Sequence, residues 1–234
     1  MNQHELDNLI SNHELWFENR AYGSRLELYE TSLNGLSLAR RRLIEAHLHK
    51  VDLTNADLKG AELDRCELNQ VCFRIADLSN ATLSDAFLQD VDLSNAKLTN
   101  ARLDGMNAFD SIFDEALIDK GFLVKASLTR CLLKRASLRG ADLRRIHISQ
   151  SSLRYANLRD TNFSRALLVD VDLRESDISG AILSHARMGP IQVHGIVGTP
   201  GNIEDCGLEA VDISEKGDGS IVTNNLEEVF RSRE

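Results

Sequence analysis

A bulky apolar residue stands at every fifth position of this chain from Leu28 to Val193, with no insertion or deletion between. Of these 34 positions, 25 are leucine and one, Ala108, is a misfit. The residue two places earlier is usually small, and alanine fills it sixteen times. Because a period of five is neither the ~3.6 residues of a helix nor the alternation of a strand, the backbone must repeat a short extended step and a turn.

Units such as Ala56-Asp57-Leu58-Lys59-Gly60 follow the pattern A-(D/N)-L-x-x, in which the chain resembles the pentapeptide-repeat family over about 170 residues. The resemblance implies a right-handed quadrilateral β-helix with four units in each square turn. The fold class that we expect is therefore an all-β solenoid, with an N-terminal capping helix and a non-repeat C-terminal tail.

A second period of twenty residues supports this expectation from within the sequence. Valine fills the small inward position at Val51, Val71, Val91 and Val171, which are separated by multiples of twenty. Residues one full turn apart stack on one face of a solenoid. About eight and a half turns, at ~4.8 Å per turn, predict a rod roughly 40 Å long.

Caps are expected at both ends, because a solenoid leaves an unpaired backbone edge there. We divide the chain into residues 1–24, an amphipathic capping helix, residues 25–193, the repeat β-helix, and residues 194–234, a hairpin or cap. Helical spacing over residues 3–19 predicts the cap, with a docking helix as the alternative. Its apolar set is Leu6, Leu9, Ile10, His13, Trp16 and Phe17.

The C-terminal tail is expected to differ from the repeat, because both prolines, Pro190 and Pro200, mark its start. Residues 207–214 and 220–224 flank a glycine-containing turn, which predicts a β-hairpin. A short closing helix is expected to follow, with Leu226, Val229 and Phe230.

The turn of residues 106–125 and its neighbours carry apolar side chains where surface is expected. These are Phe87, Phe109, Ile112, Leu117, Phe122 and Leu132. Because exposed apolar clusters often mark interaction sites, this set is the candidate partner interface. In the alternative interpretation, Phe109 turns inward to fill the space that Ala108 leaves, and the others are scattered over the surface.

Charge is banded along the chain: residues 51–120 have a balance of −8 and residues 121–165 a balance of +8. We call the positive side chains the basic belt, because a twenty-residue turn places them on all four faces. They are Lys125, Arg130, Lys134, Arg135, Arg139, Arg144, Arg145, Arg154, Arg159 and Arg165. Complementary bands favour antiparallel pairing of two rods or steering of a charged partner, and ordinary solvated charge is the alternative.

No catalytic residue, metal site or cofactor is expected. The four cysteines form no C-x-x-C pair, and among the outward histidines only His47 and His49 are neighbours. There is no glycine-rich phosphate loop and no G-x-S-x-G motif. Without a long apolar run or a signal-peptide pattern, we expect a soluble, cytoplasmic protein that does not bind membranes.

The function that we expect is a non-enzymatic protein-interaction scaffold, whose partner is another protein or a second copy. The family resemblance implies an alternative, a DNA imitation that binds DNA gyrase or topoisomerase and protects it from inhibitors. A third hypothesis is binding of an anionic polymer or lipid by the basic belt. The net charge of −9 disfavours general nucleic-acid binding, which requires excess lysine and arginine.

Overall fold

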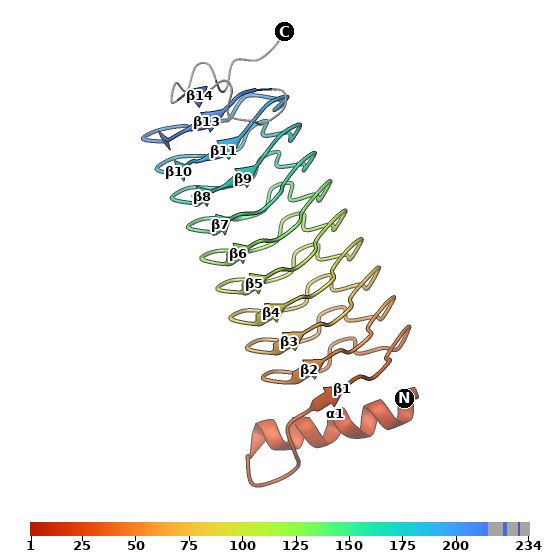
Figure 1. Ribbon diagram of the computed structural model, residues 1–234. Coiled ribbons are helices and arrows are strands. Elements are labelled where there is room, and N and C mark those ends of the chain that lie inside the picture. The colour runs from red at the N-terminus through yellow and green to blue at the C-terminus, as the bar shows by residue number, and fades with distance from the viewer. Residues whose placement is uncertain (215–221, 224–228, 230–234) are drawn as a thin grey trace.

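The computed structural model describes residues 1–214, 222–223 and 229, and the chain forms a parallel β-solenoid of about nine turns (Figure 1). One helix, α1 (Gln3–Glu18), lies across its N-terminal end (Figure 1). This architecture confirms the predicted all-β solenoid of five-residue units with an N-terminal helix. No helix in the described part of the chain is long and apolar enough to cross a lipid bilayer.

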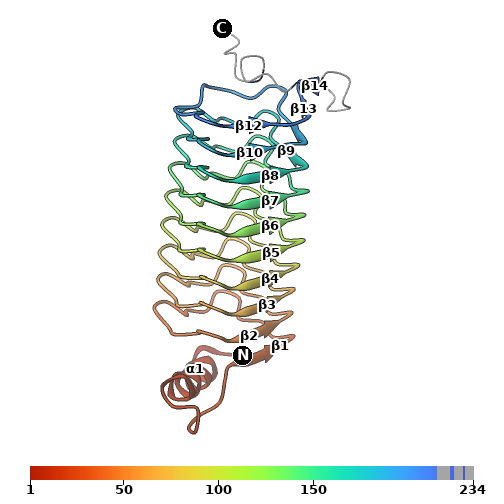
Figure 2. The same ribbon diagram turned by 90° about the vertical axis from the view of Figure 1, so that its left-hand side faces the viewer.

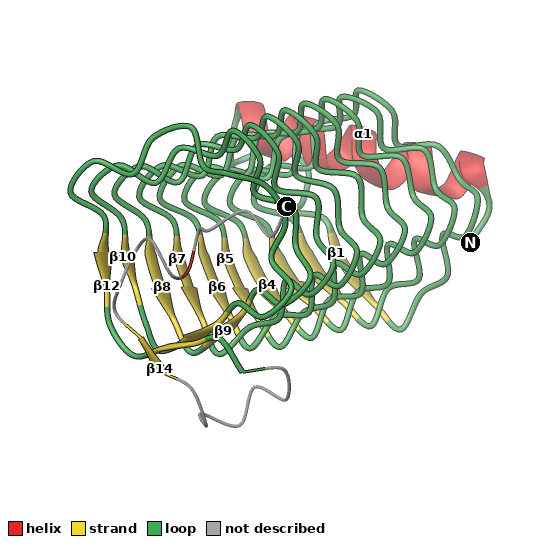
Figure 3. Ribbon diagram, turned by 90° about the horizontal axis from the view of Figure 1, so that it is seen from above, coloured by secondary structure: helices red, strands yellow, loops and turns green. Residues whose placement is uncertain are grey.

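The longest strands lie on one face, which we call the first face and which forms a ten-stranded parallel sheet (Figures 2 and 3). Its order is β1 (Glu27–Tyr29), β2 (His47–His49), β3 (Glu67–Asn69), β4 (Phe87–Gln89), β5 (Asn107–Phe109), β6 (Ser127–Thr129), β7 (His147–Ser149), β8 (Leu167–Val169), β10 (Arg187–Met188) and β12 (Gly207–Leu208). A smaller sheet on the next face contains β9 (Val171–Asp172), β11 (Ile191–Gln192), β13 (Val211–Asp212) and β14 (Val222–Thr223).

In the parallel sheets, each strand residue pairs with the residue twenty places later, as Leu28 does with Leu48. Single bridges keep the same offset on the remaining faces, for example Asp52 with Cys72, Asp57 with Asp77, and Glu62 with Thr82. We call these the second, third and fourth faces, in chain order. The twenty-residue turn predicted from the valine spacing is therefore the register of the solenoid.

The corners are built from one left-handed residue every five positions. In a representative corner, the Ala56 N–H donates to the Leu53 carbonyl oxygen at 3.1 Å, and Asn55 has a φ of 56°. A bond across four residues, with a positive φ at the third, is the geometry of a type II turn. Corners of this kind follow the second, third and fourth faces, whereas the corner after the first face has no such bond in the described turns.

The core is a stack of similar layers of inward side chains inside the square. The large and small inward positions are both buried, as in Leu53 and Val51, which are at most 1% exposed. Burying one leucine side chain contributes about 1.5–3 kcal/mol, so a core of many leucines offsets the entropy of ordering a long chain. This regular core accounts for the strict spacing of apolar residues in the sequence.

The helix α1 begins at a capping box and buries one side against the first turn. Asn2 accepts from the Glu5 N–H at 3.0 Å, and the Glu5 carboxylate accepts from the Asn2 N–H at 2.9 Å. Leu6, Ile10 and His13 are fully buried. The predicted apolar set is only partly buried, because Leu9 remains 38% exposed.

Side chains of α1 also satisfy the open backbone edge of the first turn. The Gln3 amide donates to the Ser37 carbonyl oxygen at 2.8 Å and accepts from the Ser37 N–H at 2.9 Å. The Leu26 N–H donates to Nδ1 of His13 at 3.0 Å. These hydrogen bonds replace those that a preceding turn would make. The helix therefore caps the rod both by covering its apolar end and by pairing its open backbone groups.

The coil continues past Val193, which corrects the expectation that the repeat ends there. Strands β12 and β13 pair in parallel with β10 and β11 at the same twenty-residue offset. Only one position of the register is lost, at Gly198, after which Ile203 and Leu208 resume it. The sequence indicated an end of the repeat because the inward apolar residue is missing at one position of the third face, whereas the backbone ladder needs no side chain there.

A hairpin closes the described end, because β13 and β14 pair antiparallel, with Val211 opposite Thr223. The predicted glycine turn lies outside the described residues, and so do Leu226 and Phe230 of the predicted closing helix. Val229 is buried and belongs to the hydrophobic cluster of the rod.

The left-handed corners predict a gain in stability for Ile75→Asn. Ile75 is β-branched, 56% exposed and has a φ of 60°, whereas asparagine tolerates that conformation. We expect the substitution to stabilise the fold by about 1 kcal/mol in urea unfolding, since such strain costs roughly 1–3 kcal/mol. The reciprocal Asn95→Ile, at the same corner one turn later, should lower the free energy of unfolding by a similar amount. A change of the same sign in both variants would contradict the role of corner strain.

Burial of His13 predicts that stability falls in mild acid. Burial lowers the pKa of His13 from its ordinary value near 6.5, so the unfolded chain takes up this proton at a higher pH than the folded chain. The stability that the neutral, buried His13 contributes is therefore fully present above pH ~6.5, and it is lost as the pH falls below that value. Urea unfolding of His13→Asn, which keeps an acceptor but does not titrate, should show less loss between about pH 7 and pH 5. His4→Asn, which removes an exposed histidine from α1, is the control variant for the same measurement.

Candidate interaction surface

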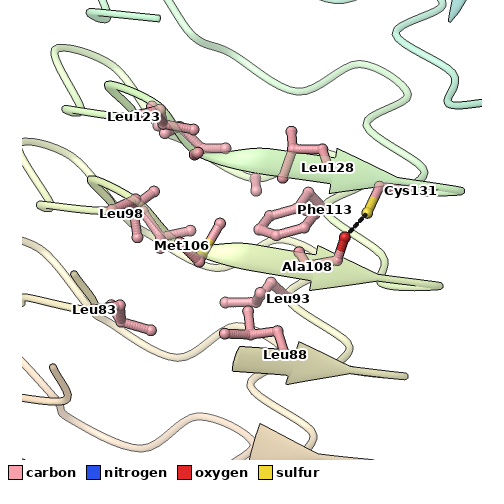
Figure 4. Packing of buried hydrophobic residues seen from close by; sticks show 14 of the residues in the cluster. Leu83, Leu88, Leu93, Leu98, Met106, Ala108, Phe113, Leu123, Leu128 and Cys131 are labelled. Carbon is pink, nitrogen blue, oxygen red and sulfur yellow. Dashed lines mark hydrogen bonds between the residues drawn. The ribbon is translucent and has the colours of Figure 1, made fainter. Parts of the chain in front are cut away.

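The turn that contains Ala108 keeps a full core because large and small side chains have exchanged places. Ala108 lies between Leu88 and Leu128 of the neighbouring strands, while the inward position two residues earlier holds Met106. The neighbouring turns place alanine in that position. All of these side chains are buried, and Figure 4 shows Met106 within the stack.

Two further side chains complete the packing beside Ala108. The ring of Phe113 points toward Ala108 (Figure 4), and the Cys131 thiol lies 3.5 Å from the Ala108 carbonyl oxygen. Phe109 points outward and is half-buried. The alternative in which Phe109 turns inward is therefore wrong, because Met106 and Phe113 already occupy the space.

Four of the six predicted interface residues lie at one corner. The rings of Phe87 and Phe109 are in contact on the first face, with centroids 5.6 Å apart. Around the corner, Ile112 and Leu132 are bridge partners on the second face. We call Phe87, Phe109, Ile112 and Leu132 the corner patch. Phe87 is 43% and Leu132 45% exposed, so the patch leaves apolar surface uncovered.

An ion pair runs between the two halves of the corner patch. Nε and Nη2 of Arg130 donate to the two carboxylate oxygens of Asp110 at 2.6 and 2.7 Å. Hydrogen bonds from Arg130 and from Gln89 hold the pKa of Asp110 below its ordinary value. This ion pair was not predicted from the sequence. The signal for it was the spacing of twenty residues between Asp110 and Arg130, which places an acid and a base at the same position of adjacent turns.

Leu117 and Phe122 do not join the corner patch. Leu117 lies on the third face and Phe122 on the fourth. They are 43% and 45% exposed, which matches the exposure of the patch residues. Each is a single apolar side chain among polar neighbours, an ordinary feature of protein surfaces.

Opposite charges flank the second-face half of the corner patch. In the turn of Ile112 the following corner carries Asp114 and Glu115, and in the turn of Leu132 it carries Lys134 and Arg135. Arg135 and Glu115 pair only loosely, at 3.9 Å, and both are more than half exposed. Such an exposed pair contributes little to stability on its own.

The basic belt is distributed over several corners and faces, and most of its members are neutralised locally. The pairs are Arg130 with Asp110, Arg135 with Glu115, Arg139 with Asp160, Arg144 with Asp142, Arg154 with Asp172, and Arg159 with Asp177. Within residues 1–214, Lys125, Lys134, Arg145 and Arg165 form no such pair. The belt is therefore less positive at its surface than the residue count indicates.

Three of the four thiols are poor nucleophiles. Burial raises the pKa of Cys66 to about 12 and the pKa values of Cys131 and Cys206 to about 11, and the thiolate is the reactive form. No group of three or more His, Cys, Asp or Glu side chains that could hold a metal ion is found among the described residues.

Comparison with known proteins identifies relatives of the fold. The family model for pentapeptide repeats matches residues 42–74, 76–114, 111–150 and 151–189, in eight copies. HetL, a pentapeptide repeat protein involved in heterocyst differentiation regulation from the cyanobacterium Nostoc, is 27% identical over 84% of this chain and 90% of its own, with a TM-score of 0.61. QnrB1, a plasmid-mediated fluoroquinolone resistance protein, is 19% identical over 70% of this chain and 90% of its own, with a TM-score of 0.41. No curated protein matches the sequence.

The exchange of sizes in the core predicts that Ala108→Leu destabilises the protein. Because Met106 and Phe113 fill the space, an added leucine overpacks the turn, and we expect a loss of about 1–3 kcal/mol in urea unfolding. The double variant Met106→Ala/Ala108→Leu restores the arrangement of the neighbouring turns and should recover to within about 1 kcal/mol of the natural chain. A single variant as stable as the natural chain would show that the space is empty.

Proposed function

This chain belongs to the pentapeptide repeat family, and on that premise we propose that it is a non-enzymatic interaction scaffold whose corner patch binds a second copy of the chain. The observation that carries the proposal is the arrangement of apolar and charged side chains beside the second face. Ile112 and Leu132 are adjacent there, and the corner that follows carries Asp114 and Glu115 in the turn of Ile112 but Lys134 and Arg135 in the turn of Leu132. Such an arrangement is complementary to itself when one rod is reversed.

A two-fold axis that crosses the rod between Ile112 and Leu132 generates this contact. It places Ile112 of one copy against Leu132 of the other, and it brings Asp114 and Glu115 toward Lys134 and Arg135 of the second copy. The ring pair of Phe87 and Phe109 then borders the contact on the same side in both copies. An isologous interface of this kind has an apolar centre and a charged rim, the usual arrangement at protein interfaces.

The charge bands support the same antiparallel direction over a longer distance. Residues 51–120 carry a balance of −8 and residues 121–165 a balance of +8, and their boundary falls between the turns of Ile112 and Leu132. Reversing one rod about this boundary sets each band against its opposite, which favours association and fixes its direction. Parallel pairing would set like charges together.

The scaffold is rigid because its surface is attached to a continuous ladder. On the second face, the Leu132 N–H donates to the Ser111 carbonyl oxygen at 3.0 Å, and the Phe113 N–H donates to the Leu132 carbonyl oxygen. A partner therefore meets a preformed surface, which lowers the entropy lost on binding. The raised pKa values of the buried thiols support a binding role over nucleophilic catalysis.

The DNA-imitating alternative, binding to DNA gyrase or topoisomerase, has weaker support. A DNA imitation requires a continuous acidic surface, and here unpaired cations such as Lys125, Arg145 and Arg165 interrupt it. The likeness to QnrB1 is in the repeat, and that protein's role in fluoroquinolone resistance does not distinguish the two functions for this chain. Regulation, the role of HetL, is compatible with a scaffold.

A matched pair of leucine substitutions tests the proposed dimer. Leu132→Glu and Leu117→Glu change side chains of almost equal exposure, 45% and 43%, on different faces. We expect the natural chain to sediment as a dimer and Leu132→Glu to raise its dissociation constant by about 100-fold, because a buried charge at the interface centre is strongly unfavourable. Leu117→Glu should stay within about twofold of the natural chain.

Analytical ultracentrifugation at several concentrations measures both effects, and circular dichroism checks that the variants remain folded. Both leucines lie on the outside of the coil, so neither substitution disturbs the core. A monomeric natural chain, or equal weakening by the two variants, would contradict the proposed use of the corner patch.

A further inference from the structure

Three cations of the basic belt form a column at the corner between the fourth face and the first. Lys125, Arg145 and Arg165 are the left-handed residues of three successive turns, with φ values of 61°, 60° and 62°. Because their backbone conformations match, their side chains leave the rod in the same direction, about 4.8 Å apart from turn to turn. We call these three residues the cation corner.

The backbone beneath the cation corner is fixed by the ladder. The N–H groups of Lys125, Arg145 and Arg165 donate to carbonyl oxygens of the next turn at 3.0, 3.0 and 2.9 Å. The positions of the three Cα atoms are therefore set before any ligand arrives. Only the flexible ends of the side chains must be ordered on binding.

The cation corner lacks the neutralisation seen elsewhere on the rod. At another position of the same corner, Arg65 lies 2.9 Å from Glu45 one turn away. At the corner between the first and second faces, Arg130 lies 2.6 Å from Asp110. Within residues 1–214, no carboxylate lies within ion-pair distance of the three cations. Like charges at neighbouring positions of adjacent strands are destabilising, so an added anion removes an existing repulsion.

A hollow of about 390 Å³ lies at this corner. Its lining residues are Val124, Lys125, Arg144, Arg145, Ser164 and Arg165. Arg144 is held at its edge by Asp142, with Nη2 at 2.7 Å from the carboxylate. The volume is within the ~300–1,000 Å³ that small-ligand sites occupy.

We propose that the cation corner is a binding site for a phosphate group. Phosphate monoesters carry about −1.5 to −2 charges near pH 7 and present three strong acceptor oxygens. Arginine binds such oxygens in a bidentate manner, and lysine adds a compact charge. A single carboxylate has one charge and two oxygens, so it matches a set of three unpaired cations less well.

A long nucleic acid fits this corner poorly. The column spans three turns, about 10 Å along the rod, and the preceding residues of the same corner are Gly105 and Asp85. On the other side, His185 is followed by Asp205. A polyanion that followed the rod would meet repulsion at Asp85 and the overall charge of −9. The site therefore favours one compact phosphate group.

The site is independent of the proposed dimer, because the cation corner borders the fourth and first faces and the two-fold contact uses the second. Titration calorimetry and ³¹P NMR of the full chain with inorganic phosphate at low ionic strength test it. We expect saturable binding at one site, weakened at least about tenfold by Arg145→Gln. Arg165→Gln and Lys125→Gln should weaken it in the same direction.

Arg159→Gln is the matched control, because it removes the same charge from a residue that pairs with Asp177 at 3.1 Å on another face. Its binding should stay within about twofold of the natural chain. Absence of saturable phosphate binding, or equal weakening by Arg145→Gln and Arg159→Gln, would overturn the proposal.

Phosphoserine peptide and free phosphate distinguish the two sources of the ligand. A singly phosphorylated peptide that binds more tightly than inorganic phosphate identifies a protein-borne phosphate, and the reverse order identifies a small phosphate ester. Both orders support the site. Equal binding by the unphosphorylated peptide would count against it, because the phosphate would then contribute nothing.

Discussion

The left-handed corner is the constraint on which the whole rod depends. One residue in five adopts a positive φ, and in three corners of each regular turn the chain closes a bond across four residues. Each left-handed corner turns the chain from one face of the square to the next, so four corners bring the backbone back to the first face one strand spacing higher. Without them the leucines would lie along an extended strand, and no closed core would form. Side chains at the corners, such as Ile75 and Lys125, point outward and are exposed.

The features of the fold that follow from the regular repeat could be predicted from the sequence, whereas those at irregular positions of the repeat could not. The spacing of Val51, Val71 and Val91 indicated the turn length, because inward residues report the register directly. The continuation beyond Val193 was missed, since Gly198 removes one apolar residue while leaving the backbone ladder intact. The packing around Ala108 was also missed, because the compensating Met106 is recognisable only when both inward positions of a turn are compared.

The candidate surface shows a similar division. An apolar set was predicted from residue type and outward position, yet only four of its six members share a corner. Leu117 and Phe122 were grouped with them because a list along the chain does not show which face each residue occupies, although the twenty-residue register does. For the basic belt, ion pairs decide which charges remain available, and Arg144 and Arg145 differ in this respect despite being adjacent. Pairing of that kind depends on side-chain geometry, which residue spacing does not determine.

The unbroken register has a consequence for how surface features are placed relative to one another. Because five residues make a quarter of a turn and twenty make a whole one, an inserted block of twenty would move every residue beyond it along the rod by about 4.8 Å and leave each on the same face. An inserted block of five would swing everything beyond it by a quarter of the circumference. The number of residues between two surface features therefore determines both their distance along the rod and the face on which each one lies. The first face, for example, always lies between the cation corner and the corner that Arg130 and Asp110 occupy.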